Sequence, residues 1–208
     1  MNNQWNKMIY KIWSPFYDKI FNSGAFLKAR EKLVKDIELF KGKRILFVGV
    51  GTGADLERIQ HRDYEITAID FSKDMLDKAK QKFNQSSIEF LEMDAQKLEF
   101  EEESFDLVVG SLILSVVPDA DKALKEMVRV TKQGGEILLF DKFAPKNKQI
   151  SVGKKLIRPL ISLLGTDIGL NFEQTFARYI HSVAVQADEP VMFGDMYRKI
   201  KLLKVRKW

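Results

Sequence analysis

The spacing of apolar residues changes near residue 43, and this change separates two kinds of predicted structure. Before it, apolar residues recur at helical spacing in residues 1–22 and 25–40. The apolar face of the second stretch consists of Phe26, Ala29, Leu33, Ile37 and Phe40. The opposite face is mostly Lys, Arg and Glu. We therefore predict amphipathic helical pieces over 1–22 and a helix over 25–40.

Short apolar runs alternate with helical patterns between residues 43 and 141. The runs predict strands at 44–48, 65–69, 88–91, 105–110 and 136–140. The intervening segments predict helices over 54–60, over the residues after Ser72 and over those after Asp119. Both Ser72 and Asp119 are good N-caps. This alternation indicates an α/β fold, Rossmann-like and doubly wound, with a mostly parallel sheet.

The alternation ends after residue 141. A helix is predicted over 150–164, followed by strands over 177–187 and 197–205 with a turn containing Pro190 and Gly194. Two strands with no helix between them pair antiparallel. No linker interrupts the chain, so we predict one domain over 1–208. Its parts are a helical segment (1–42), a core (43–141) and a helix with a late β-hairpin (142–208).

The composition is typical of a globular protein and argues against disulfide and metal sites. The 208 residues suit one domain, and 45% apolar with 30% charged residues are typical of a soluble globular protein. With no cysteine and two histidines, we predict no disulfide framework and no metal site. The longest nearly apolar run, 107–117, is too short to cross a bilayer, and no signal peptide is visible, so we expect a cytoplasmic protein.

The net charge of +5 is unevenly distributed. Residues 1–44 carry +6, residues 45–141 carry −9, and residues 142–208 carry +8. A basic flank can contact an anionic membrane surface, nucleic acid or an acidic substrate. A solvated surface without a partner is the alternative interpretation.

The stretch LFVGVGTGAD, residues 46–55, carries the clearest chemical signal. Gly49, Gly51 and Gly53 follow a predicted strand, where glycines allow a tight turn and a close approach of backbone to ligand. Such a loop presents backbone N–H groups to a nucleotide-like ligand. GVGTGA also satisfies the dinucleotide-binding fingerprint, so the loop alone does not exclude a nicotinamide-dependent enzyme.

Two acids follow the next two predicted strands, at the same edge of the sheet. Asp70 comes about twenty residues after the loop, the spacing typical of an acid that binds ribose hydroxyls. Met75 could pack on an adenine or in the core. Asp94 could accept a hydrogen bond from an exocyclic amine, and the N–H of Ala95 could bind the ring. The alternative for Asp94 is a solvated loop position.

Ser111 and Ser115 follow the fourth predicted strand, at the edge that would face the reacting end of a ligand. A loop or helix-capping role is the alternative for both. The sequence contains no Walker loop, zinc-ligand spacing or paired catalytic carboxylates, and neither histidine belongs to a triad-like pattern.

The order LFVGVGTGAD, AIDFSKDML, LEMDAQKLEFEEESFDLVVG and RVTKQGGEILL resembles class I S-adenosylmethionine-dependent methyltransferases. The resemblance implies that the glycine loop wraps the methionine part of S-adenosylmethionine, and that the two acids hold ribose and adenine. It also implies a seventh, reversed strand at 197–205 and an N-terminal helical lid. The implied cofactor shell is Gly49, Gly51, Gly53, Asp70, Phe71, Met75, Asp94, Ala95 and Ser111.

Within that class the chain is similar to bacterial phosphatidylethanolamine N-methyltransferases, on WSPFYDKIF, SLILSVVPDADKALKEMVRV and RPLISLLG followed by NFEQTFARY. The resemblance implies methyl transfer to a small molecule or phospholipid headgroup, with an amine favoured. Quinone-precursor C-methylation, thiol methylation and a nicotinamide-dependent oxidoreductase are alternatives. We assign the acceptor pocket to Tyr10, Tyr17 and Ser115, with lid or core packing as the alternative for both tyrosines.

The expected partners follow from the same features. The basic amphipathic stretches 1–22 and 150–164 suit peripheral contact with an anionic membrane. No nucleic acid is expected, because the chain has no Asn-Pro-Pro-Tyr type motif and no cysteine nucleophile.

One position departs from the family pattern. Phe47 stands two residues before the first glycine, where the family usually has Glu or Asp that orients the cofactor. Asp55 or another polar group could take its place. Without a replacement, weaker cofactor binding or a noncatalytic binding protein is expected.

Overall fold

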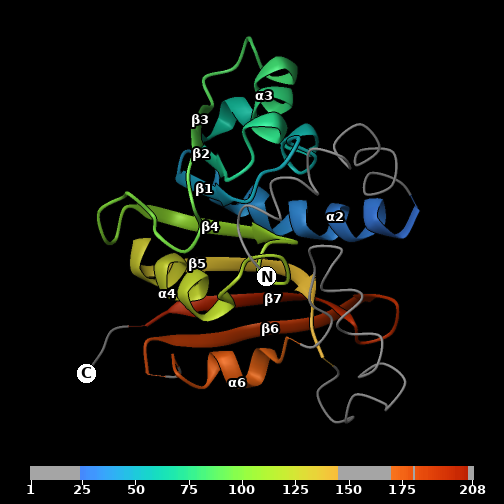
Figure 1. Ribbon diagram of the computed structural model, residues 1–208, viewed down its shortest axis with the longest axis vertical. Coiled ribbons are helices and arrows are strands. Elements are labelled where there is room, and N and C mark those ends of the chain that lie inside the picture. The colour runs from blue at the N-terminus through green and yellow to red at the C-terminus, as the bar shows by residue number, and fades with distance from the viewer. Residues whose placement is uncertain (1–23, 145–169, 180, 206–208) are drawn as a thin grey trace.

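The computed structural model describes residues 24–144, 170–179 and 181–205. Its centre is a seven-stranded sheet with the strand order β3-β2-β1-β4-β5-β7-β6 (Figure 1). The strands are β1 (Arg44–Val48), β2 (Glu65–Asp70), β3 (Glu89–Glu92), β4 (Phe105–Ser111), β5 (Thr131–Lys142), β6 (Val183–Met192) and β7 (Tyr197–Lys204). The chain therefore winds outward from β1 in both directions, as the alternating pattern predicts.

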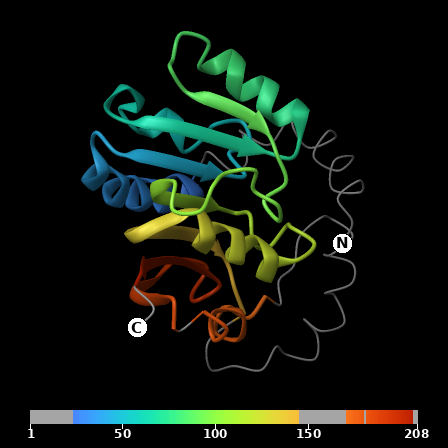
Figure 2. The ribbon, with the colours of Figure 1, turned by 90° about the vertical axis from the view of Figure 1, so that its left-hand side faces the viewer.

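Six strands run in one direction, and β7 alone among the described strands runs against them. Strands β1 to β5 pair in parallel, and Figure 2 shows the arrowheads of β1 and β2 pointing the same way. Strand β7 pairs antiparallel with both β5 and β6. The predicted fold class and its reversed last strand are confirmed. Because the parallel strands end together, the segments that follow β1, β2, β3 and β4 meet at one edge of the sheet.

Helices cover both faces of the sheet. They are α2 (Gly24–Ile37), α3 (Lys73–Lys82), α4 (Ala120–Val130) and α6 (Phe172–Phe176), with the 3₁₀ turns η1 (Glu38–Phe40), η2 (Leu56–Arg58) and η3 (His61–Asp63). The two predicted N-caps are present. The Ser72 hydroxyl accepts from the N–H of Met75 at 3.4 Å, and the Asp119 carboxylate accepts from that of Lys122 at 3.1 Å.

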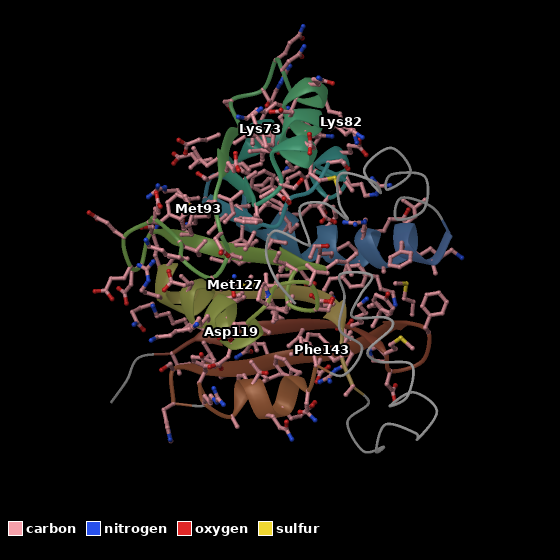
Figure 3. All side chains as sticks on the ribbon, in the orientation of Figure 1. Lys73, Lys82, Met93, Asp119, Met127 and Phe143 are labelled. Atoms are coloured by element: carbon pink, nitrogen blue, oxygen red, sulfur yellow. The ribbon has the colours of Figure 1, made fainter. Side chains whose placement is uncertain are left out.

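Alternation along the strands divides the core into two layers. Leu46 and Val48 of β1 pack in the layer that contains α4 and α6. Ile45 and Phe47 pack in the layer that contains α2 and α3. Figure 3 marks Met127, a fully buried residue of α4, in the first layer. A period of two along a strand buried on both faces produces this division.

The helix predicted over 54–60 is wrong. The segment forms turns and the single 3₁₀ turn η2. The few residues between the glycine loop and the next turn cannot offset the cost of nucleating an α-helix.

The boundaries of the late hairpin also differ from the prediction. Residues 177–179 and 181–182 are not strand, the unpredicted helix α6 precedes them, and β6 continues through Pro190 to Met192. Pro190 was expected in the turn. In the described structure β6 is an edge strand, where a proline can lack its N–H without breaking an interior ladder. The turn is instead at 193–196.

The helices predicted over 1–22 and 150–164, with Tyr10 and Tyr17, lie outside the described residues. In the ranges that the structure does describe, no helix has the length and apolarity needed to cross a membrane.

Candidate functional site

The glycine loop leaves β1 in a left-handed conformation. The φ angles of Gly49, Gly51 and Gly53 are 73°, 57° and 84°, a region that other residues reach only with strain. The N–H groups of Gly49 and Val50 both donate to the carbonyl of Ile69 on β2, each at 2.9 Å. The loop is therefore attached to the end of the neighbouring strand.

The three glycines differ in what surrounds them. A Cβ on Gly49 would lie 2.6 Å from Cδ1 of Ile113, and one on Gly53 would lie 2.7 Å from Cε2 of Phe83. A Cβ on Gly51 would have no atom within 4 Å. Packing thus explains two of the glycines, whereas Gly51 borders open space of the kind that a ligand could occupy.

Gly53→Ala should lower the free energy of unfolding more than Gly51→Ala does. Both changes place a Cβ at positive φ, which costs about 1–2 kcal/mol. At Gly53 the methyl group also meets the Phe83 ring, and overpacking adds about 1–3 kcal/mol. Urea denaturation of the two variants measures the difference. Phe83→Leu should recover part of the loss in Gly53→Ala and none in Gly51→Ala; equal losses in the two alanine variants would contradict the packing argument.

Asp70 connects the loop with the helix that follows. Its Oδ2 accepts from the N–H of Gly51 and its Oδ1 from the N–H of Ser72, both at 2.8 Å. Burial of the carboxyl raises the pKa of Asp70 to about 6, although these backbone hydrogen bonds act in the opposite direction. The group is therefore ionised at neutral pH and close to its titration point.

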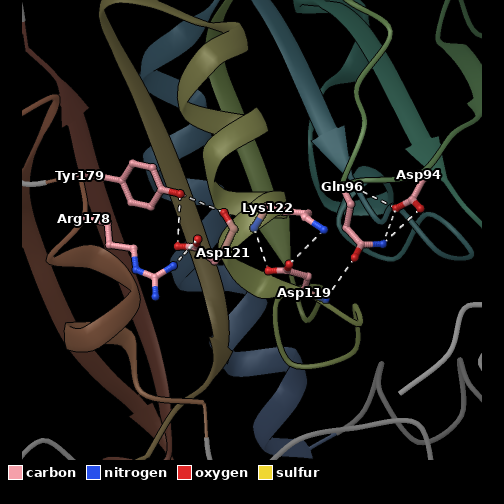
Figure 4. A network of polar contacts seen from close by, with 7 residues as sticks. All are labelled: Asp94, Gln96, Asp119, Asp121, Lys122, Arg178 and Tyr179. Atoms are coloured by element: carbon pink, nitrogen blue, oxygen red, sulfur yellow. Dashed lines mark hydrogen bonds and ion pairs between the residues drawn. The ribbon is translucent and has the colours of Figure 1, made fainter.

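Asp94 lies at the same edge as Asp70. Strands β2 and β3 are paired, and the N–H of Met93 donates to the carbonyl of Asp70 at 3.1 Å, so the two acids follow neighbouring strand ends. The side-chain amide of Gln96 donates to both carboxylate oxygens of Asp94, at 2.9 and 3.1 Å. Figure 4 shows that Gln96 also accepts from the N–H of Asp119, which connects Asp94 to the start of α4.

The segment after β4 forms the next part of this edge. Ser111 is half-buried, and Leu112 beside it has a φ of 56°, a conformation often found at functional sites. Ser115 is buried, and its N–H donates to the Asp141 carboxylate at 3.2 Å. Burial raises the pKa of Asp141, which lies near the end of β5. Asp141 therefore holds the loop after β4 in place.

The remaining predicted cofactor residues differ in their solvent exposure. Phe71 is half-buried beside Asp70. Ala95 is 5% exposed, and Met75 is 2% exposed on the inner side of α3. This burial favours the core-packing interpretation of Met75. Tyr10 and Tyr17 have no described position, so the acceptor pocket assigned to them stays a prediction.

Sequence reasoning missed Arg30, which it placed on the solvated face of the helix. Arg30 is 3% exposed on the inner face of α2, and its Nη1 donates to Oδ1 of Asp55 at 2.5 Å. The same atom lies 3.4 Å from Oγ of Ser111. The signal was present, because Arg30 follows Ala29 directly and is spaced three residues from Leu33 on the apolar face.

Within residues 24–144, 170–179 and 181–205, no three His, Asp or Glu side chains come together in a way that could hold a metal ion.

Sequence comparison defines the class of this protein. Residues 46–139 match a family model described as a methyltransferase domain. A phosphatidylethanolamine N-methyltransferase of Cereibacter sphaeroides is 34% identical over 160 residues, which cover 75% of this chain and 77% of that protein. The chain belongs to the class I S-adenosylmethionine-dependent methyltransferases, and S-adenosylmethionine is its methyl donor.

A second group of relatives has a different acceptor in its name. A demethylmenaquinone methyltransferase of Staphylococcus aureus (strain MRSA252) is 35% identical over 144 residues, which cover 66% of this chain. The match spans 60% of that longer protein. The two relatives agree on methyl transfer and differ in the acceptor.

Solved structures agree on the fold. The [4+2]-cyclase SpnF has a TM-score of 0.78 at 16% identity and covers 99% of this chain and 97% of its own. The YcgJ protein of Bacillus subtilis has a TM-score of 0.68 at 17% identity. The match covers 86% of this chain and 98% of that protein. At such identities the likeness concerns architecture alone, since one fold supports several chemistries.

Proposed function

We propose that this enzyme transfers a methyl group from S-adenosylmethionine to the amine of a small molecule or a phospholipid headgroup. The observation that carries the proposal is the match to the phosphatidylethanolamine N-methyltransferase over three quarters of both chains. The demethylmenaquinone relative supports methylation of a quinone-precursor carbon as the second candidate.

The cofactor residues in this proposal lie along the edge formed by the ends of β1 to β4. Gly49, Gly51 and Gly53 would wrap the methionine part, with Gly51 beside the open space. Asp70 would accept hydrogen bonds from the two ribose hydroxyls, as its position at the end of β2 favours. Adenine would lie toward Asp94, whose carboxylate is held in orientation by Gln96.

The remaining assignments follow the order of the strands. The backbone N–H of Ala95 would meet the adenine ring and Phe71 would line its side, while Met75 packs in the core. Ser111 would lie toward the reacting end, because it ends β4 at the centre of the sheet.

In methyl transfer the main task of the protein is to align the acceptor with the methyl group. S-adenosylmethionine supplies a methyl group on a positively charged sulfur, which is already an activated leaving group. The chain's residues bind, orient and exclude water, and such alignment accounts for a large part of a displacement barrier. A neutral amine acceptor carries its own lone pair, so the proposal needs no dedicated general base.

Cofactor affinity should fall as the pH drops through 6. The ribose hydroxyls need an ionised acceptor, and the pKa of Asp70 is raised to about 6, so about one tenth of the protein is ionised at pH 5. We expect S-adenosylhomocysteine to bind about tenfold more weakly at pH 5 than at pH 7 in calorimetry. Asp70→Asn should abolish most of this dependence; an unchanged slope in that variant would assign the effect to another group.

The raised pKa of Asp70 has the opposite effect on the free energy of unfolding, which it increases at low pH. In the protein without ligand, Asp70 binds its proton more tightly than the unfolded chain does. Its contribution to stability is therefore fully present below the ordinary aspartate pKa of 3.8 and is lost as the pH rises through about 6.

The acceptor is tested by supplying three substrates with methyl-labelled S-adenosylmethionine. They are vesicles containing phosphatidylethanolamine, soluble phosphoethanolamine and a demethylated quinone. Label in an N-methylated product supports the amine proposal, and the vesicle and soluble arms separate lipid from free headgroup. Label on a quinone carbon alone would establish the second candidate.

Peripheral membrane contact is part of the lipid version of the proposal. Its support is the basic, amphipathic character of residues 1–22 and 150–164. Co-sedimentation with vesicles should rise with anionic lipid content and fall with salt. Binding that is independent of both would contradict an electrostatic attachment.

A further inference from the structure

The end of β1 is apolar in this enzyme. Phe47 is 2% exposed and packs in the core layer that contains Leu33 of α2. Its side chain therefore belongs to the interior and offers no acceptor to a ligand. A charged complement for the amino-acid end of the cofactor must come from elsewhere on the chain.

A buried ion pair, Arg30–Asp55, lies at the exit of the glycine loop. Asp55 comes two residues after Gly53, at the exit of the glycine loop, and is 6% exposed. Arg30, which pairs with it, also reaches Ser111 at the end of β4. The pair thus joins three segments at the ligand edge: α2, the loop after β1 and the end of β4.

The Arg30–Asp55 ion pair is buried, and burial of an ion pair is energetically costly. Taking two charges out of water is expensive, and a buried ion pair is often replaceable by apolar side chains without loss of stability. A buried pair is therefore weak evidence for a role in stability alone. Its position beside a ligand site favours a role in binding.

We propose that Arg30 and Asp55 form the subsite for the zwitterionic amino-acid end of S-adenosylmethionine, in place of the acid missing at Phe47. The guanidinium is complementary to the α-carboxylate of the cofactor, and the Asp55 carboxylate to its α-ammonium group. Each charged group of the ligand end would therefore contact a group of opposite charge. The low-dielectric surroundings would strengthen both electrostatic contacts. The inference rests on the proposed position of the cofactor at this edge.

Two ligands that differ only at the amino-acid end test the proposal. S-adenosylhomocysteine and 5′-methylthioadenosine share adenosine and a thioether sulfur, and the second lacks the α-amino and α-carboxyl groups. Calorimetry gives the ratio of their dissociation constants in the wild type, in Arg30→Met/Asp55→Leu and in Arg30→Gln/Asp55→Asn. The second variant keeps polar side chains of similar size, in case the apolar pair fails to fold.

The wild type should prefer S-adenosylhomocysteine, and both double variants should reduce that preference by at least about tenfold, with methylthioadenosine affinity nearly unchanged. The matched control is Lys132→Met/Asp106→Leu, which removes an ion pair of 3.0 Å at the opposite edge and should leave the ratio unchanged. An equal loss for both ligands, or a wild type without preference, would overturn the proposal. A wild type that binds neither ligand would instead contradict the proposed cofactor site.

Discussion

Asp70→Ala should weaken S-adenosylhomocysteine binding by about 100-fold or more. Hydrogen bonds to a charged group are worth about 1.5–3 kcal/mol each, and the variant loses the acceptor for two ribose hydroxyls. It also releases the N–H groups of Gly51 and Ser72, which the carboxylate holds at 2.8 Å. Calorimetry measures the affinity, and circular dichroism establishes that the variant is folded.

Asp106→Asn is the matched control for Asp70. Asp106 is also a strand acid that accepts from a backbone N–H, that of Arg44 at 3.0 Å, but it lies at the beginning of β4 and so at the opposite edge. Its substitution should leave the affinity within about twofold. If Asp106→Asn weakens binding as much as Asp70→Ala does, the loss reflects general destabilisation and the ribose assignment is wrong.

Gly51→Leu should abolish cofactor binding with a modest loss of stability. The direction of its Cβ is open, with no atom within 4 Å, so a leucine side chain would occupy the space assigned to the cofactor. The backbone cost of a Cβ at positive φ is about 1–2 kcal/mol. We expect affinity for S-adenosylhomocysteine to fall by about 100-fold or more, because the ligand and the leucine side chain would compete for the same space.

Gly51→Ala separates volume from backbone strain. Both variants place a Cβ at the same φ of 57°, and only the leucine fills the open space. The alanine variant should therefore retain most of its affinity while showing a similar loss in urea denaturation. If both variants lose binding equally, the backbone conformation of the loop is what matters, and the space beside Gly51 does not hold the ligand.

Local patterns predicted much of the fold because they report local physics. A helix needs a cap and an apolar stripe, and the residues around Ser72 and Asp119 have both, so α3 and α4 begin where expected. Strands β1 and β4 are apolar runs buried on both faces, which leaves little choice of structure. The late hairpin was less readable, because whether Pro190 is tolerated depends on β6 being an edge strand.

Some residues of the candidate site could also be identified from local sequence patterns, whereas others could not. Gly51 and Asp70 were recognisable because a loop and an acid at fixed spacing along the chain are also neighbours in a parallel sheet, and their hydrogen bond of 2.8 Å is the consequence. Arg30 was not recognisable as a partner of Asp55, since the two are separated by 25 residues and by a change from helix to strand. Gln96 and Asp119 likewise come together through the packing of α4.

By itself, the sequence determined the parallel strands, the two capped helices α3 and α4, the glycine loop, the acids at the strand ends and the family, because each is encoded in residues close along the chain. Only the tertiary structure decided that Phe47 is a core residue, that Gly51 borders open space while Gly53 is packed against Phe83, and that a buried arginine faces the loop. The physical reason is that burial and charge pairing depend on which segments the sheet brings together, and that choice is made by the whole fold.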